Sequence, residues 1–341
     1  MELNEKGVNT LLVKDINTRI VMLELKRQKN ATIKELSVLC DLTVVTVKTI
    51  LEDMIKAGRA FKGELVPSKG GRPSQSYHFN ENYSLGLSLF IREIDGEDSV
   101  CLRVFDLFGK IKEAEDYKMG MVTLENIEEL IEKSIRRFSQ IGAISIGIPG
   151  IEYEGEIVSL DYEDFIGTPI VSRLEKKFKL PVIIENDVNA AVLGRARISE
   201  DIGTEIYIYF PRKYKPGSGI RVNGKILKGK RHFAGEIGWL PLNIEWGAAL
   251  ADSIEGFTDA ASRVIISMIS VLDPDSVIIH GEYISEEHIK KIRQKCSAGL
   301  PDRMTANISC AEDFSLDYEN GLIDLTLSTL ESEEKLWQHF Y

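Results

Sequence analysis

The chain has 341 residues, of which 43% are hydrophobic and 28% charged, and a formal net charge of −11. This composition is typical of a folded globular protein with two or three domains. No apolar run approaches the ~18 residues of a membrane-spanning helix. The first ten residues, MELNEKGVNT, lack the pattern of a secretion signal, so we expect a cytoplasmic protein that does not enter a membrane.

Charge divides the chain into two parts. Residues 1–80 contain 13 Lys and Arg against 9 Asp and Glu, whereas residues 81–341 contain 29 against 44. Because an acidic body repels DNA, any contact with nucleic acid should be confined to the basic N-terminal part. We therefore predict an N-terminal domain over 1–80 and a body over 81–341.

The N-terminal part has the pattern of a winged helix-turn-helix. Thr32 is a plausible N-cap for a first helix, and Gly58 is a stop signal for a second. A basic, glycine-rich loop (PSKGGRP) follows between two short runs of strand-forming residues. The expected elements are helices over 33–39 and 44–57, joined by a turn at 41–43, and strands over 60–66 and 76–80.

The second of these helices has a face suited to DNA. Its apolar residues recur at helical spacing and should face the core (Val47, Ile50, Leu51, Met54 and Ile55). The opposite face is mostly small, neutral or basic, which suits close approach to bases and phosphates. The candidate DNA-contacting residues lie on this face, at its N-cap and in the basic loop: Thr43, Val44, Val45, Lys48, Thr49, Lys69 and Arg72. The alternative is a helical cap with a purely structural role.

The body shows strands alternating with helices. Short connections between them indicate an α/β fold with mixed sheets. The expected strands are 83–91, 100–108, 111–117, 143–148, 181–185, 205–210, 219–222 and 277–280, and the expected helices are 124–139, 170–178, 188–197 and 259–272.

Four motifs occur in an order that resembles the ROK family of bacterial sugar kinases and sugar-responsive repressors. They are GGRP at 70–73, IGIPG at 146–150, PVIIENDVNAA at 181–191 and AGEIG at 234–238. The resemblance covers roughly residues 18–285. It implies an N-terminal winged helix-turn-helix followed by a two-lobed, actin-like (ribonuclease H-like) ROK domain, here with a shortened second lobe. For a repressor of this kind the expected partners are a double-stranded DNA operator and a second copy of the chain, because helix-turn-helix modules usually read paired half-sites.

The second and third body motifs supply the candidate effector site. Asn186 and Asp187 end a predicted strand, where α/β folds expose ligand-binding groups. The resemblance implies that Asp187 occupies the position of the kinase general base and that Glu236 is a second sugar-binding carboxylate. Asn186, Asp187 and Glu236 are therefore the candidate residues for binding a sugar or sugar phosphate. The alternative for Asp187 is a helix N-cap.

The motifs that bind nucleotide in related kinases are altered in this chain. Ser88 and Phe90 replace an aspartate and a glycine of the first phosphate-binding turn, and a phenyl ring cannot line a cradle that needs close backbone approach. The second phosphate loop, 211–219, is bulky and cationic in its first half, and the adenosine-contacting double glycine corresponds to His280-Gly281. We therefore expect no ATP-dependent catalysis and no catalytic residue.

Metal and cofactor binding are not expected either. Trp239 stands where the family usually has a histidine that contacts sugar or zinc, and residues 240–258 contain no Cys or His. Trp239 could stack on a sugar or fill space. Three functions remain open: a repressor of carbohydrate-related genes that senses a sugar-like effector, an active ATP-dependent sugar kinase with a fused N-terminal domain, and a regulator controlled by a partner protein.

Overall fold

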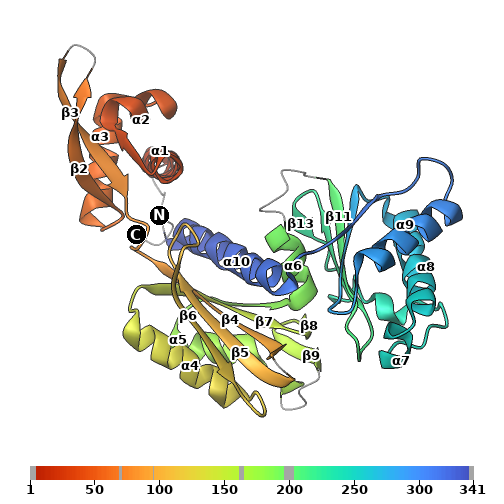
Figure 1. Ribbon diagram of the computed structural model, residues 1–341. Helices are drawn as coiled ribbons and strands as arrows, with labels where there is room; N and C mark the ends of the chain where they lie inside the picture. The colour runs from red at the N-terminus through yellow and green to blue at the C-terminus, as the bar shows by residue number, and fades with distance from the viewer. Residues whose placement is uncertain (1–4, 69–70, 95, 161–164, 196–202, 338–341) are drawn as a thin grey trace. The chain divides into compact units, whose positions relative to one another are not determined.

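A computed structural model describes residues 5–68, 71–94, 96–160, 165–195 and 203–337 (Figure 1). The chain forms two compact units, which we call the head and the body. The head comprises residues 1–85, 106–110 and 331–341, and the body comprises 86–105 and 111–330. None of the helices in the described ranges is long and apolar enough to cross a membrane.

The head is a winged helix with one helix more than the sequence predicted. Thr32 and Glu35 form a reciprocal cap at the start of the second helix, as the sequence predicted for Thr32. Gly58, at φ +72°, ends the third helix. The three strands form one antiparallel sheet in the order β1-β3-β2. In chain order the elements are α1 (Glu5–Gln28), β1 (Asn30–Thr32), α2 (Ile33–Leu39), α3 (Val44–Lys56), β2 (Ala60–Ser68) and β3 (Gly71–Phe79).

Helix α1 was not predicted, and the reason is its pattern of apolar residues. Val21, Met22 and Leu25 are buried and help to form the core of the head, while Val13 and Ile20 are exposed on another side. A helix is predicted when its apolar residues recur every three to four positions along one face. In a helix with apolar residues on two sides this recurrence is lost.

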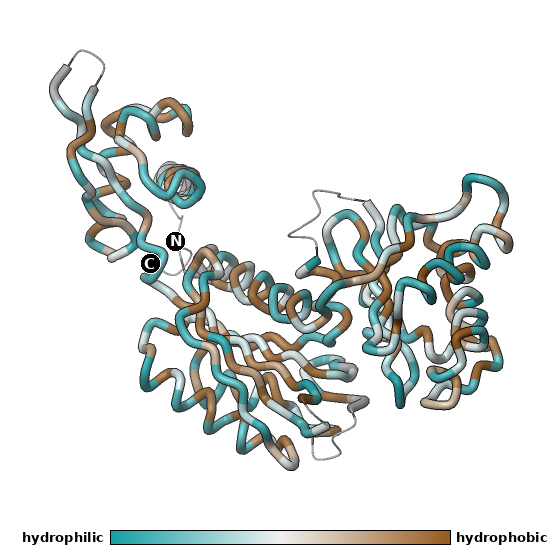
Figure 2. The backbone as a smooth tube through the Cα atoms, in the orientation of Figure 1, coloured by the Kyte–Doolittle hydropathy of each residue, from teal (hydrophilic) through white to brown (hydrophobic). Residues whose placement is uncertain are grey.

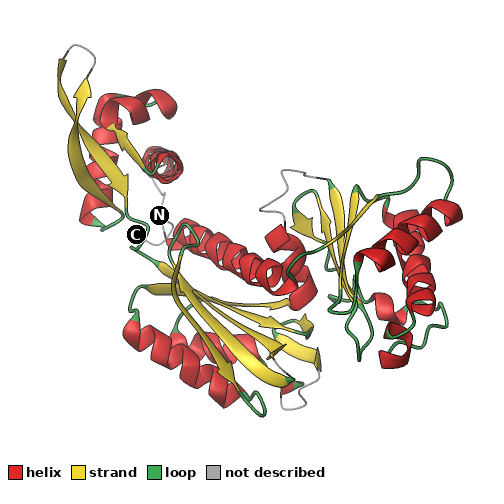
Figure 3. Ribbon diagram, in the orientation of Figure 1, coloured by secondary structure: helices red, strands yellow, loops and turns green. Residues whose placement is uncertain are grey.

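The body contains two five-stranded sheets with the same strand order (Figure 3). In each sheet a three-stranded antiparallel meander is followed by two strands that are parallel to each other. This repetition is the two-lobed, actin-like arrangement that the resemblance to the ROK family implied. The first sheet contains, in sheet order, β10 (Val182–Asn186), β7 (Ile141–Ile148), β4 (Leu85–Ile94), β5 (Glu97–Phe105) and β6 (Ile111–Lys118). The second contains β13 (Lys225–Ile226), β12 (Gly217–Val222), β11 (Thr204–Tyr209), β14 (Ser276–His280) and β15 (Asn307–Cys310).

The strands of both sheets are rich in hydrophobic residues (Figure 2), most of which are buried, and helices pack against them. The elements are α4 (Leu124–Arg137), α5 (Ile170–Phe178), α6 (Asp187–Arg195), α7 (Ala248–Ala251), α8 (Ile254–Leu272), α9 (Glu286–Gly299) and α10 (Phe314–Trp337), with a hairpin of β8 (Gly150–Tyr153) and β9 (Glu156–Leu160). Helix α8 begins five residues before its predicted start because Ser253 caps it. Helices α9 and α10 and strand β15 follow the last predicted element.

Helix α6 is fixed in position by three glycines. A Cβ at Gly219 of β12 would collide with the backbone oxygen of Val188, and a Cβ at Gly321 of α10 would collide with that of Ala190. Gly194 of α6 likewise has no room for a side chain against Asp317. These glycines let β12 and α10 pack closely against α6. This packing fixes the start of α6 and thus the positions of Asn186 and Asp187.

Candidate functional site

The exposed face of α3 carries the predicted DNA-contacting side chains. Val47, Ile50, Leu51 and Met54 are buried as predicted, which leaves Val44 and Val45 52% and 73% exposed. Lys48 and Thr49 are also exposed. Val44 and Val45 could make apolar contacts to base edges, and Lys48 could contact a phosphate.

The two threonines of this face are partly engaged by the helix itself. Thr43 is the N-cap of α3, and its Oγ1 accepts a hydrogen bond from the backbone N–H of Thr46 at 3.1 Å. Thr49 donates its hydroxyl to Val45 O at 3.1 Å. Each hydroxyl oxygen keeps acceptor capacity.

The wing is a twisted hairpin with a bulge next to Gly63. The pairing of β2 with β3 shifts register between Lys62 and Leu65, and a Cβ at Gly63 would collide with the ring of His78. Arg72 is the second residue of β3, while Lys69 lies outside the described residues. The predicted wing is therefore present, and its tip belongs to the part of the chain that is not described.

In the body, a narrow polar hollow lies where β8, the end of β10, the start of α6 and the loop before α7 meet. Its volume is about 30 Å³, room for a few waters. Asn186 and Glu236, two of the three predicted effector residues, line it together with Gly150, Glu152, Ile184, Glu185, Asn189, Gly217, Ser218, Lys228, His232 and Ala234.

Asn186, rather than Asp187, caps helix α6. Asn186 Oδ1 accepts hydrogen bonds from the backbone N–H groups of Val188 and Asn189 at 2.9 and 3.1 Å, and its Nδ2 donates to Gly150 O at 3.1 Å. The alternative reading of Asp187 as the cap is therefore wrong: cap geometry needs acceptance from the second and third helical residues, which only the preceding side chain can reach. The Asn186 amide is largely occupied by this structural role.

Asp187 and Glu236 remain as the two carboxylates with acceptor capacity for a ligand. The pKa of Asp187 is raised to about 7, chiefly by burial and also by the nearby charge of Glu236, although the hydrogen bond that Oδ1 accepts from Val188 N at 2.8 Å lowers it. Burial also raises the pKa of Glu236, whose carboxylate has no ion pair or hydrogen bond among the described residues. Two half-buried carboxylates without a cation suit the donor hydroxyls of a neutral polyol.

An ion pair of Lys228 and a histidine contact of His232 line the hollow from the second lobe. Lys228 Nζ lies 2.7 Å from the buried Glu185 Oε2, and His232 Nδ1 lies 3.3 Å from Glu152 Oε2 and 2.6 Å from Glu152 O. Lys228 and His232 come from the loop after β13, whereas Glu185 and Glu152 come from β10 and β8 of the first lobe. His232 is thus engaged in the fold, as a lone histidine usually is.

Asn189 lines the hollow but is not among the predicted effector residues. Its Nδ2 donates to Glu185 Oε1 at 3.2 Å, and its buried Oδ1 has no hydrogen-bond partner in the described structure. Glu185 and Asn189 belong to the same ENDVN motif as Asn186 and Asp187, so the motif itself could have selected them. Lys228 has no comparable local pattern, because its partner is distant in the sequence.

The position of the first phosphate-binding turn is filled by a hydrophobic core. Ser88 is fully buried, and its hydroxyl has no hydrogen-bond partner among the described residues. Phe90 is also buried and packs against Tyr318 of α10, with ring centroids 5.1 Å apart. Close backbone approach by a phosphate is not compatible with this packing.

Further aromatic side chains extend this core toward the second sheet. Phe314 stacks on Tyr209 with centroids 4.5 Å apart and an interplanar angle of 10°, and on His280 at 5.7 Å. The resemblance matches His280 to the first glycine of the adenosine-contacting pair, and Gly281 keeps the second. Two of the three altered nucleotide motifs therefore join one aromatic cluster.

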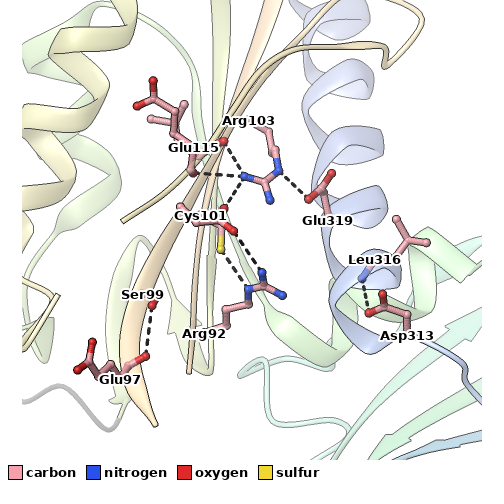
Figure 4. A network of polar contacts seen from close by, with 11 residues as sticks. Arg92, Glu97, Ser99, Cys101, Arg103, Glu115, Asp313, Leu316 and Glu319 are labelled. Carbon is pink, nitrogen blue, oxygen red and sulfur yellow. Dashed lines mark hydrogen bonds and ion pairs between the residues drawn. The ribbon is translucent and has the colours of Figure 1, made fainter. Parts of the chain in front are cut away.

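Arg92 and Arg103 form a polar network with neighbouring strands and with α10 (Figure 4). Arg103 pairs with Glu319 of α10 and with Asp116 of β6, both at 2.7 Å, and Arg92 Nε donates to Cys101 Sγ at 3.1 Å. Both guanidinium groups lie over the Phe90 ring, at 5.5 and 6.0 Å from its centroid. The network ties β4, β5 and β6 to α10.

The second phosphate loop and Trp239 form a separate exposed feature. Lys215 Nζ lies 3.7 Å from the centroid of the Trp239 ring, and Trp239 is 65% exposed. Trp239 therefore does not fill interior space, which removes one of its two predicted roles. Within the described residues no cluster of three or more His, Cys, Asp or Glu side chains could hold a metal.

Known proteins similar to this chain include repressors and kinases. The chain is 29% identical over 295 residues to a xylose repressor of Caldicellulosiruptor bescii, covering 83% of this chain and 73% of that protein. It is 25% identical over 240 residues to the xylose repressor of Bacillus subtilis, covering 68% and 62%. A glucokinase of Halalkalibacterium halodurans is 33% identical over 138 residues, covering 38% and 41%.

Solved structures show the same fold. A ROK family transcriptional regulator described as a homolog of the E. coli MLC protein superimposes with a TM-score of 0.63 at 15% identity, over 92% of this chain and 99% of that one. A ROK family glucokinase from Streptomyces griseus, in complex with glucose and AMPPNP, gives 0.55 at 18% identity over 72% and 100%. Residues 94–249 match the ROK family.

Proposed function

We propose that the protein is a transcriptional repressor of carbohydrate-related genes that binds an operator through its head and a small sugar through its body. The observation that carries this proposal is the winged helix with an exposed face of Val44, Val45 and Lys48 on α3. The relatives named as xylose repressors support the same function. The recognition helix would enter the major groove, with the wing of β2 and β3 against the backbone or minor groove.

The body would act as a sensor without kinase activity. Asp187 and Glu236 would provide acceptors for sugar hydroxyls, whereas Phe90 and His280 stand at positions that resemble the nucleotide-binding motifs of related kinases and pack against other aromatic rings. Sugar binding needs a wider pocket, since ligand sites usually enclose ~300 Å³ or more and the hollow has about 30 Å³. The lobes would therefore separate when the sugar enters, and this change would be the link to DNA affinity.

DNA and sugar binding are tested together with one variant. Asp187→Ala should abolish the effect of sugar on operator affinity and leave sugar-free operator binding intact, because a ligand shifts the DNA equilibrium only through its different affinity for the two states. The measurement is fluorescence anisotropy with DNA from upstream of the gene, against a panel of aldoses that includes D-xylose. If Asp187→Ala fails to bind DNA in the absence of sugar, Asp187 has a structural role and not a role in sugar sensing.

The kinase alternative is tested by calorimetry. ATP titrated with and without magnesium should give no binding heat, and hexoses or pentoses should not be phosphorylated. Micromolar ATP binding with turnover on any sugar would restore the kinase reading. A DNA affinity that no sugar changes, but that a cell extract does, would favour control by a partner protein.

A further inference from the structure

The recognition helix α3 begins with two branched apolar side chains that are open to solvent. Val44 and Val45 are its first two residues, and they are 52% and 73% exposed. In a helix-turn-helix fold the N-terminal residues of the second helix contact the base edges in the major groove. The two valines therefore stand at the part of α3 that would meet the bases.

The side chains around the valines offer little hydrogen-bonded readout of bases. Residues 33–57, which contain both helices of the motif, have no Arg, Asn or Gln. Arg is the most common bidentate partner of guanine, and Asn and Gln are those of adenine. The hydroxyl groups of Thr43 and Thr46 share a hydrogen bond at 2.8 Å, and Thr49 donates to Val45 O at 3.1 Å. The hydroxyl groups near the start of α3 are thus engaged within the helix.

The charge around the valines favours DNA as their partner. Lys48 lies one helical turn after Val44 and Val45, and side chains three and four positions apart are neighbours on a helix. Its ion pair with Glu52, at 3.9 Å, joins two exposed side chains and is easily exchanged for a phosphate. Residues 1–80 contain 13 basic against 9 acidic side chains, which suits a polyanion. A phosphate on Lys48 would hold the first turn of α3 in the groove.

We propose that Val44 and Val45 read the C5-methyl groups of thymine, so that the operator carries T·A pairs where the first turn of α3 enters the major groove. Thymine is the base whose major-groove edge presents a methyl group, and apolar side chains recognise it by contact. The inference rests on the proposed repressor function and adds the class of base that the head selects.

Replacement of thymine by deoxyuridine tests the methyl contact by itself. Deoxyuridine keeps the hydrogen-bonding groups of thymine and lacks its C5-methyl group. The full chain first selects its preferred sequence from a random duplex library. Each thymine of that sequence is then replaced in turn, and affinity is measured by fluorescence anisotropy. Replacement of a contacted thymine should lower affinity about fourfold, as expected for the loss of one buried methyl group.

Valine variants identify the side chains that make the contact. A deoxyuridine that costs the unsubstituted chain about fourfold should cost Val44→Ala or Val45→Ala little, because the partner of the methyl group is already absent. Val38→Ala is the matched control, since Val38 is 75% exposed on α2, and it should keep the full loss. The loss should also be equal at low and at physiological salt, because an apolar contact releases no counterion.

Two results overturn the proposal: a selected sequence in which every thymine tolerates deoxyuridine, or a loss that persists in both Val44→Ala and Val45→Ala. Either would mean that the valines cover some other surface. A chain that enriches no sequence from the library would refute the repressor function itself. A chain that enriches a sequence and ignores its thymine methyl groups would refute only the readout by the valines.

Discussion

Phe90 of β4 and Tyr318 of α10 pack with ring centroids 5.1 Å apart and planes inclined by 59°. Both rings are buried, and Gly147 of β7 has no room for a Cβ against Tyr318. In the related kinases the strand that carries Phe90 here leads into a phosphate-binding turn. The packing makes Phe90 part of the hydrophobic core of the body, which it stabilises.

Truncation of this ring should be costly. Phe90→Ala should lower the free energy of unfolding by about 3–5 kcal/mol, because it removes a large buried side chain and leaves a cavity. The measurement is chemical denaturation, with Phe233→Ala as the control, since Phe233 is exposed and its loss should change stability by no more than ~0.5 kcal/mol. Equal effects of the two substitutions would show that the aromatic cluster is not a structural core.

Lys48 should contribute a phosphate contact. Lys48→Ala should weaken operator binding and make the slope of log affinity against log salt shallower by ~1, as expected for one lost contact. Lys176→Ala, an exposed lysine of α5 in the body, should change neither quantity. If Lys48→Ala and Lys176→Ala have the same salt slope as the unsubstituted protein, the exposed face of α3 does not bind DNA.

The head shows which features a sequence can predict. Helix α3 was predicted because Val47, Ile50, Leu51 and Met54 form one buried stripe and Thr43 caps it, so the local pattern and the tertiary burial agree. Helix α1 was missed because its apolar residues serve two surfaces. The spacing of hydrophobic residues predicts a helix and its buried side only when these residues lie on one face.

The hollow in the body shows which features of a site the sequence can and cannot predict. Asn186, Asp187 and Glu236 were selected from motifs, and the structure places Asn186 and Glu236 in one hollow, with Asp187 close enough to interact with Glu236. The division of roles between Asn186 and Asp187 depends on backbone geometry at the start of α6, which the sequence does not show. The pairing of Lys228 with Glu185 joins two lobes, and no local spacing predicts it.

The Lys228–Glu185 pair should stabilise the closed hollow. Lys228→Met leaves Glu185 buried without its cation and should lower the free energy of unfolding by about 1.5–3 kcal/mol. Adding Glu185→Gln should recover part of that loss in a double-mutant cycle, because the stranded charge is removed. Lys230→Met, an exposed neighbour, is the control and should be neutral. Strictly additive effects of Lys228→Met and Glu185→Gln would mean that the pair does not couple the lobes.

The raised pKa of Asp187 gives a pH dependence of known sign. Its pKa rises from 3.8 to about 7 in the folded protein, so between these values the native state binds the proton more tightly than the unfolded state. Folding stability should therefore fall as pH rises from about 4 to about 7. Glu236, with a pKa raised by burial, acts in the same direction.

Asp187→Asn isolates this contribution. The variant should unfold at the same temperature as the unsubstituted protein near pH 4 and at a higher temperature at pH 8, because the buried charge is absent. Asp302→Asn, on an exposed turn, should give a curve parallel to that of the unsubstituted protein. A Tm difference for Asp187→Asn that is constant from pH 4 to pH 8 would contradict a shifted carboxyl group.

The most direct test of a sugar-sensing repressor is a titration of labelled DNA from upstream of the gene, followed by anisotropy, with and without millimolar aldoses. A repressor of this gene should bind this DNA at least ~10³-fold tighter than scrambled DNA at the same salt concentration. That affinity should also change by roughly 5- to 150-fold with one sugar of the panel, the range typical of coupled sites. Equal affinity for upstream and scrambled DNA, together with no response to any sugar, would contradict this function.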